Sequence, residues 1–377
     1  MRTGWIFLLS GVAAAMPFSL AHPEADKFIV EVSSGERREV TEAEKFALKK
    51  KGVNFIDVTA WPDTAHLRAR RPRVPNYPTN LTQGETVKHL QTFLDSRNLQ
   101  RNLDMFTSFN NRYYQSNSGN LSAEWLFGQV KGYVEAGSPV GVSIFQHAYR
   151  QSSIIASIPG KSTKTIVVGA HMDSINGGVG ENRTTARAPG ADDNGSGSMT
   201  ILEAYRTLLL NDTIASGQAE HPIEFHWYAA EEVGLLGSSN IFYSYADVGK
   251  QVAAMLNQDM TGYTAGYIAR NMTPKFGIVT DNVDASLTKF TRRIIDAYTS
   301  TEAGDTECGY ACSDHASATR AGYPSAFVFE GEMRTVNDNP FVHTADDTID
   351  KLDFEHMLEH ARLVVGWVLE LAFARLD

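Results

Sequence analysis

The chain has 377 residues, of which 42% are hydrophobic, and this is enough to bury a large core in one sizeable domain. Acidic residues outnumber basic ones by 44 to 34, so the formal net charge is −10. This charge argues against nucleic acid or an anionic membrane as a partner, because both require a basic protein surface.

The first 21 residues have the features of a secretory signal peptide. Arg2 precedes an apolar run from Trp5 to about Ala15, and small residues follow at Ser19 and Ala21. We expect cleavage after Ala21. The run is too short to cross a membrane, and no later segment approaches the ~20 apolar residues that a span requires. The sequence therefore predicts a secreted, extracellular protein without a membrane anchor.

Residues 22–76 differ in character from the rest of the chain. They contain a strand-like run at 28–32, a charged helical stretch at 42–51, and then a basic, proline-rich stretch from Arg68 to Pro78. That stretch is the only clear linker in the chain. One interpretation of the segment before it is a small N-terminal subdomain joined by a hinge.

From residue 77 onward, strand-like and helical patterns alternate without an internal repeat. Helical periodicity marks residues 86–98, 123–135, 195–210, 283–298 and 353–374. Apolar β-like runs lie at 153–157, 165–169, 223–229, 252–256, 276–280 and 325–329. This alternation predicts an α/β fold, a single globular domain with a mixed, largely parallel central sheet flanked by helices on both faces.

Five potential metal ligands lie just after or near these apolar runs: His171, Asp193, Glu232, Asp259 and His343. Taken alone, each is more often structural, such as a histidine satisfied by the backbone or an acidic pair in a solvated turn. Together they offer imidazole and carboxylate donors without cysteine, a set that suits zinc or a similar divalent ion. Ligands at the carboxyl ends of successive strands converge on one crevice of an α/β sheet. The combination therefore predicts a metal site.

Three motifs make this pattern specific: Ala188-Pro-Gly-Ala-Asp-Asp193, Glu231-Glu-Val-Gly-Leu-Leu-Gly-Ser238 and Cys308-Gly-Tyr-Ala-Cys-Ser-Asp-His315. From about Tyr77 to the C-terminus the chain resembles the co-catalytic zinc aminopeptidases, that is, the secreted bacterial and fungal leucine aminopeptidases. The resemblance implies two Zn²⁺ ions per chain, bridged by Asp193. It places His171 and Asp259 on one ion, and Glu232 and His343 on the other.

The same resemblance implies a domain organisation and a substrate. It implies a propeptide at residues 22–76 and a peptidase domain at 77–377, acting as a monomer that removes single residues from peptides with a free N-terminus. Its partners would be these peptides and its own propeptide. Four residues fall in motifs that resemble those lining the family's apolar side-chain pocket, which predicts a preference for large residues such as Leu: Met260, Tyr310, Phe327 and Phe329. Core packing is the alternative for the two phenylalanines, which alternate in a strand.

Elementary electrostatics is consistent with this ligand set. Two divalent ions roughly 3.5–4 Å apart repel each other, so they need a shared carboxylate and further anionic ligands. Three carboxylates leave one net positive charge, which acidifies a water held between the ions. Glu231 follows a strand end, from which it can reach that water, and it is the predicted general base. Asp173 is predicted to orient the His171 ring by accepting its N–H, with a helix cap as the alternative role.

The two cysteines, Cys308 and Cys312, suit a disulfide in an oxidising compartment, where it would shape a local turn. Half of a zinc site is the alternative, but no second pair exists to complete it. Five sequons are predicted to carry N-linked glycans: Asn80, Asn120, Asn182, Asn211 and Asn271. A sixth, Asn194, adjoins Asp193, so we expect it to be bare.

Other functions use similar residues. A related di-metal carboxypeptidase or amidase, or a glutaminyl cyclase, would need a comparable ligand set, although no cluster of arginines for a substrate carboxylate stands near the motifs. A non-catalytic, peptidase-like binding module is the third possibility. Such a module would be expected to lack several ligands, whereas this chain has all five and Glu231.

Overall fold

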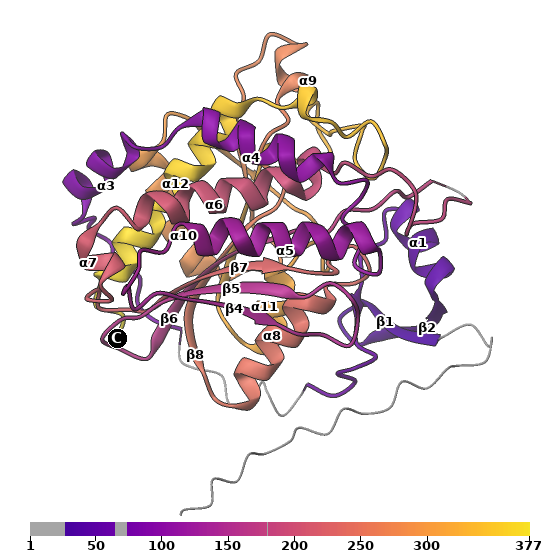
Figure 1. Cartoon of the computed structure of the whole chain (residues 1–377), viewed down its shortest axis with the longest axis horizontal. Helices are drawn as coiled ribbons and strands as arrows, with labels where there is room; N and C mark the ends of the chain where they lie inside the picture. The colour runs from indigo at the N-terminus through magenta and orange to yellow at the C-terminus, as the bar shows by residue number, and fades with distance from the viewer. Residues whose placement is uncertain (1–26, 65–73, 179) are drawn as a thin grey trace, which may run out of the picture.

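The computed structural model describes residues 27–64, 74–178 and 180–377. The predicted signal peptide and the first part of the basic linker lie outside these residues. The main body is built on an eight-stranded sheet with the order β10-β9-β11-β8-β6-β7-β5-β4 (Figure 1). In chain order its strands are β4 (Gly141–Phe145), β5 (Ser153–Ile158), β6 (Lys164–His171), β7 (Ile223–Tyr228), β8 (Gln251–Gln258), β9 (Phe276–Val279), β10 (Ala303–Thr306) and β11 (Ser325–Phe329).

The sheet is mixed, with a parallel centre. Strands β11, β8, β6 and β7 are parallel neighbours, and β10 is parallel to β9. The β11–β9, β5–β7 and β4–β5 pairs are antiparallel. Central parallel strands are covered on both faces and are therefore apolar almost throughout, as in β6, where every residue after Lys164 is buried.

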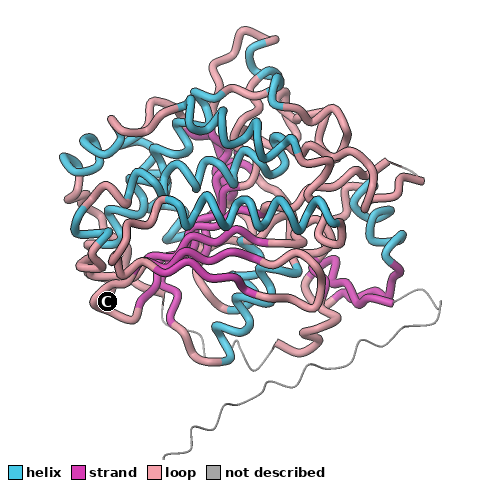
Figure 2. The backbone as a smooth tube through the Cα atoms, in the orientation of Figure 1, coloured by secondary structure: helices cyan, strands magenta, loops and turns pink. Residues whose placement is uncertain are grey.

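Helices cover both faces of the sheet, as Figure 2 shows. One face packs against α3 (Gly84–Gln91), α4 (Ser96–Ser108), α5 (Asn117–Gly132), α6 (Gly197–Leu208), α10 (Ala285–Tyr298) and α12 (Phe354–Ala372), and the other against α8 (Leu236–Asp247) and α11 (His315–Ala321). Side chains of β6 alternate between the two cores, with Ile166 and Val168 in the first and Val167 in the second. The short elements are η1 (Ala191–Ser196), α7 (Asp212–Ala215), α9 (Ala265–Ile268) and η2 (Ile349–Lys351). This arrangement confirms the predicted fold class.

The N-terminal segment, residues 27–64, forms a small sheet of its own with the order β2-β1-β3. Its elements are β1 (Lys27–Ser33), β2 (Glu36–Thr41), α1 (Glu42–Lys50) and β3 (Ile56–Asp57), and they lie at one end of the molecule (Figure 1). The Asp57 N–H donates to the Gly234 carbonyl at 3.0 Å. The carboxylate of Glu31 is bound by Arg320. The segment is therefore docked on the main body.

One expected helix is wrong in its extent. Residues 86–98 do not form a single helix, because α3 ends at Gln91 and α4 begins at Ser96. Asp95 caps the second helix, since its carboxylate accepts the Arg97 N–H at 2.9 Å. The sequence patterns also do not predict β4, β10, α8 or α11.

Among the described helices, none is long and apolar enough to cross a membrane.

Candidate functional site

Three predicted ligands lie where neighbouring parallel strands end. His171 is the last residue of β6, Asp259 directly follows β8, and Glu232 follows β7 after a short stretch. Because β8, β6 and β7 are adjacent and parallel, their carboxyl ends lie at the same edge of the sheet. All three side chains are buried.

Asp193 comes from η1, the turn that opens α6. Gly190, before this turn, has a φ of 51°, and a Cβ there would lie 2.4 Å from the Asp193 carbonyl oxygen, so only glycine fits. The Asp347 carboxylate accepts the N–H groups of Asp192 and Asp193 at 3.0 and 3.1 Å. These bonds fix the backbone that carries Asp193. His343, the last predicted ligand, lies in the loop that leads to Asp347.

Asp193 is shared by two clusters of predicted ligands. Its Oδ1 lies 3.1 Å from His171 Nε2, which is also 3.3 Å from Asp259 Oδ1. Its Oδ2 lies 2.9 Å from His343 Nε2, which is also 3.0 Å from Glu232 Oε2. Each cluster therefore brings together one imidazole nitrogen and two carboxylate oxygens, all within 4.8 Å of one another.

Both clusters fit a divalent metal ion. Ligand atoms about 2.0–2.2 Å from a tetrahedral zinc ion lie roughly 3.3–3.5 Å apart, close to the separations found here. Within the described ranges, His171 Nε2, Glu232 Oε1 and Asp259 Oδ1 are buried and have no hydrogen-bond partner. Buried polar atoms usually have such partners. These atoms are therefore free to coordinate a cation.

Asp173 supports the site in two ways. Its carboxylate accepts the N–H groups of Glu231 and Glu232 at 2.9 and 3.2 Å, so it holds the stretch that follows β7. Its Oδ1 lies 3.5 Å from His171 Nδ1, while its carbonyl oxygen is nearer, at 3.2 Å. The backbone and the side chain of Asp173 thus both face the His171 ring, and the shorter carboxylate contacts are those with the backbone after β7.

Ser313 positions Asp259, and the sequence motifs do not single it out. Its hydroxyl donates to Asp259 Oδ2 at 2.5 Å and accepts from Asn257 Nδ2 at 2.8 Å. These bonds leave Asp259 Oδ1 to face His171. Ser313 stands within the Cys308–His315 motif, but nothing in that motif marks it as a partner of Asp259. The part played by Asn257 depends on tertiary contacts and has no such signal.

Glu231 is buried beside both clusters and belongs to neither. Burial raises the pKa of its carboxyl group well above the ordinary value. Burial by itself would lower the pKa of His343, but the carboxylates of Glu232 and Asp193 raise it to about 10. The excess of carboxylates in the site therefore stabilises positive charge.

A cavity opens over the two clusters. Three of the four predicted pocket residues line it: Met260, Phe327 and Phe329. Tyr310 lies elsewhere, since its hydroxyl donates to the Glu31 carboxylate of the N-terminal segment. Its predicted role in the pocket stays a prediction. Three residues of the N-terminal segment also line the cavity: Lys49, Asn54 and Phe55.

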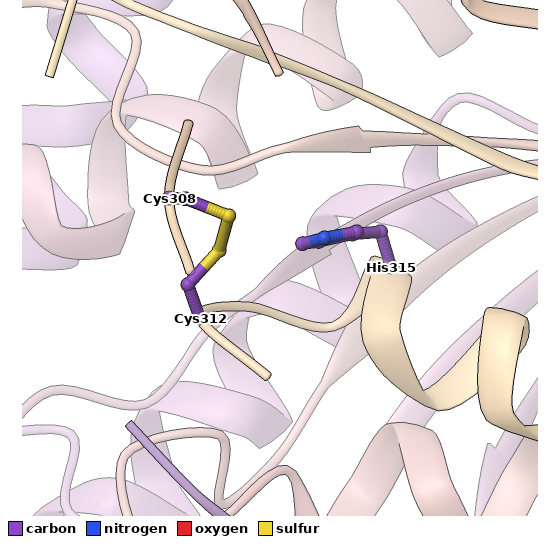
Figure 3. A group of neighbouring side chains, drawn as sticks. All are labelled: Cys308, Cys312 and His315. Atoms are coloured by element: carbon purple, nitrogen blue, oxygen red, sulfur yellow. A yellow bond between two sulfur atoms is a disulfide. The ribbon is translucent and has the colours of Figure 1, made fainter. Parts of the chain in front are cut away.

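Cys308 and Cys312 form the predicted disulfide (Figure 3), with Cα atoms 5.9 Å apart. The ring of His315 lies close to the two sulfur atoms, and the three residues are near enough together to hold an ion. However, sulfur atoms bonded to each other offer no thiolate, so half of a zinc site is not supported. The disulfide instead closes the short loop that carries Tyr310 and leads into Ser313.

The predicted glycosylation sites are accessible to different degrees. Asn80, Asn182 and Asn271 are exposed, and Asn120 and Asn211 are half-buried. Asn194 is buried, and its Nδ2 donates to the Gln258 carbonyl at 2.9 Å. This environment supports the expectation that Asn194 carries no glycan.

Residues 153–368 match the sequence pattern described as peptidase family M28. This range covers more than half of the chain and includes all five predicted ligands and Glu231. The chain belongs to peptidase family M28.

The M28 chain is similar to fungal leucine aminopeptidases. It is 50% identical over 368 residues to a probable leucine aminopeptidase of Arthroderma otae, with 98% of each chain covered. It is 50% identical over 352 residues to probable leucine aminopeptidase 1 of Trichophyton verrucosum, with 92% of this chain and 93% of the relative covered. The family and these relatives identify the M28 chain as a metallo-aminopeptidase, which confirms the predicted enzyme class.

Solved structures agree with this assignment. The LapA aminopeptidase of Legionella pneumophila superposes with a TM-score of 0.76 at 29% identity, with 90% of this chain and 92% of LapA covered. A glutaminyl cyclase of Bacteroides thetaiotaomicron has a TM-score of 0.57 at 18% identity, covering 78% of this chain and 100% of the cyclase. At that identity the cyclase shares the fold alone, so this alternative activity is not favoured.

Proposed function

We propose that this metallo-aminopeptidase binds two Zn²⁺ ions and releases large apolar residues, such as Leu, from the free N-termini of peptides. The observation that carries the metal count is the position of Asp193, because its two carboxylate oxygens face two different clusters of ligands. One metal ion would use only one of these clusters. Relatives named leucine aminopeptidases support the substrate preference.

The chain's own residues divide the chemistry between them. When bound, the two ions would polarise the scissile carbonyl group and the attacking water. Glu231 accepts a proton from that water on its carboxylate and passes it to the leaving amine. Glu231 is buried beside both clusters and belongs to neither, so its carboxylate is available for these two proton transfers. Asp173 fixes the backbone from which Glu231 reaches the water.

The site binds two groups of the substrate's N-terminal residue, its α-ammonium group and its side chain. The carboxylates of Glu232 and Asp259 accept charge-assisted hydrogen bonds from the free α-ammonium group. The side chain of that residue enters the part of the cavity that Met260, Phe327 and Phe329 line. Apolar walls favour an apolar side chain because its burial removes apolar surface from water.

Separate ligand sets predict separate metal losses. His171→Ala and His343→Ala each remove one neutral donor from one cluster, so we expect about one metal ion to remain in either variant, against two in the unaltered protein. Metal content is measured by mass spectrometry on purified protein, with the exposed His89→Ala as control. If both variants lose every ion, or neither loses any, the two clusters are not independent sites.

We further propose that residues 22–76 are a propeptide and residues 77–377 the mature enzyme. The segment 27–64 supports this proposal because it folds into a sheet of its own and lines the cavity. Tyr77 belongs to the body, since its hydroxyl donates to the Ala253 carbonyl at 2.8 Å and its ring packs on Phe290. A cleavage just before Tyr77 would therefore leave the body intact.

Limited proteolysis within the basic, proline-rich stretch is expected to raise activity, because a cut there lets the segment that lines the cavity dissociate from the body. The measurement follows hydrolysis of a leucyl chromogenic amide while mass spectrometry follows the cleavage. An intact precursor as active as the trimmed form would contradict an inhibitory role for the segment.

We also propose that the chain is secreted after removal of residues 1–21, carries glycans on exposed sequons, and acts as a monomer. The apolar run after Arg2 supports secretion, and the exposed positions of Asn80, Asn182 and Asn271 support glycosylation. N-terminal sequencing of the secreted protein, its mass before and after deglycosylation, and light scattering test the three parts.

A further inference from the structure

Lys49, in the last turn of α1, reaches from the N-terminal segment into the metal-ligand clusters. Its Nζ lies 2.9 Å from Glu232 Oε2 and 3.5 Å from Glu231 Oε2. The Lys49 side chain is only 18% exposed, although it ends in a charged group. The same Glu232 oxygen faces His343 Nε2 at 3.0 Å. The ammonium group is therefore inside the candidate site and not merely at its rim.

Helix α1 is held so that Lys49 points this way. The buried Lys45, one turn earlier, pairs with Asp57 at 2.6 Å and lies 3.4 Å from the Val233 carbonyl oxygen. Phe46 packs in an apolar cluster that includes Val233. These contacts fasten the helix to the stretch that carries Glu231 and Glu232, which leaves Lys49 directly over their carboxylates.

We propose that Lys49 places its ammonium group where the site takes the α-ammonium group of a peptide substrate, so that the N-terminal segment occupies the site as a substrate mimic. This proposal rests on the proposed aminopeptidase function. Both groups are primary ammonium ions with three donors, and carboxylates bind them by charge-assisted hydrogen bonds. The segment and a substrate therefore compete for the same acceptors.

Two further residues of the N-terminal segment, Asn54 and Phe55, also present to the cavity groups that resemble those of a peptide substrate. Asn54 donates from Nδ2 to the Cys308 carbonyl at 3.2 Å, and Phe55 lines the same cavity as Met260 and Phe329. The segment thus presents an ammonium group, a hydrogen-bonding amide and an apolar ring to the cavity. Lys50, the next residue, is exposed and provides a matched control.

The test compares uncleaved chains carrying Lys49→Met, Lys49→Arg or Lys50→Met with the unaltered precursor and with the trimmed enzyme. Binding of n-butylamine, a simple primary amine, is measured by calorimetry, and metal content is measured on the same samples. We expect the trimmed enzyme and the Lys49→Met precursor to bind the amine. The unaltered, Lys49→Arg and Lys50→Met precursors should bind it about 10- to 100-fold more weakly, the effect of one charge-assisted hydrogen bond.

Metal content should be equal in all precursors. A higher metal content in the Lys49→Met chain would overturn the proposal, since Lys49 would then replace a metal ion instead of a substrate. Equal amine binding by the Lys49→Met and Lys50→Met chains would also overturn it. Failure of the trimmed enzyme to hydrolyse a leucyl amide would instead contradict the proposed function, so the two failures are distinguishable.

Discussion

Glu231→Gln is expected to leave both metal ions bound and to remove most of the turnover. The substitution keeps the size of the side chain and lies outside both ligand clusters, but an amide cannot accept the proton of the attacking water. Loss of a general acid–base group typically costs about 10²–10⁴-fold in kcat. Turnover of a leucyl chromogenic amide and metal content are measured on the same trimmed sample.

The exposed Glu302→Gln is a matched control for this change, because it alters the charge equally and leaves the site untouched. Glu232→Gln is an informative contrast, since it changes a predicted ligand and should lower the metal content. Zinc loss in Glu231→Gln, or near-normal turnover, would show that Glu231 is a ligand or is dispensable.

An acetyl group on the substrate N-terminus is expected to abolish most of the cleavage. Acetylation removes the positive charge that Glu232 and Asp259 bind, and it adds bulk where the cavity is lined by their carboxylates. The comparison is kcat/KM for leucyl and acetyl-leucyl chromogenic amides with the trimmed enzyme. Similar rates for the two compounds would refute the aminopeptidase mode of binding.

Glycyl and aspartyl chromogenic amides, compared with leucyl amide in the same assay, test the side-chain pocket. Each CH₂ group buried against Met260, Phe327 and Phe329 contributes about 0.8 kcal/mol, so leucyl amide should be cleaved much faster than glycyl amide. Aspartyl amide should be poor, because its carboxylate would be buried near other carboxylates without a partner. Faster release of Asp than of Leu would contradict the assignment of these walls.

Much of the site could be predicted because its signals are local. His171 and Asp259 lie at the ends of apolar strands. In a parallel sheet the carboxyl ends of neighbouring strands lie at the same edge, independently of the other elements of the fold. Glu231 and Glu232 could be predicted in the same way, because they lie shortly after the end of β7. The disulfide of Cys308 and Cys312 could be predicted from the expected oxidising compartment and from the lack of a second cysteine pair to complete a zinc site.

Other features depend on contacts between residues far apart in the chain. Periodicity continues through residues 92–95, so only the Asp95 cap and the packing of two separate helices show that the helix breaks there. Ser313 binds Asp259 because α11 begins beside the end of β8. No local sequence pattern predicts that these two elements lie side by side. Tyr310 fits a pocket motif, yet in this form of the chain it binds Glu31.

The sequence by itself predicted the ligand types, the strand-end positions of His171, Glu232 and Asp259, and a base beside them, because these depend on residue chemistry and on where apolar strands end. The tertiary structure alone decided that Lys49 reaches Glu232, and it supplied the geometry in which the two oxygens of Asp193, a residue that the resemblance predicts to be shared, face different clusters. Both depend on how distant segments dock. The buried ion pair of Lys45 with Asp57 and the apolar packing of α1 bring Lys49 and Glu232 together. Neither interaction produces a periodic pattern in the sequence from which it could be predicted.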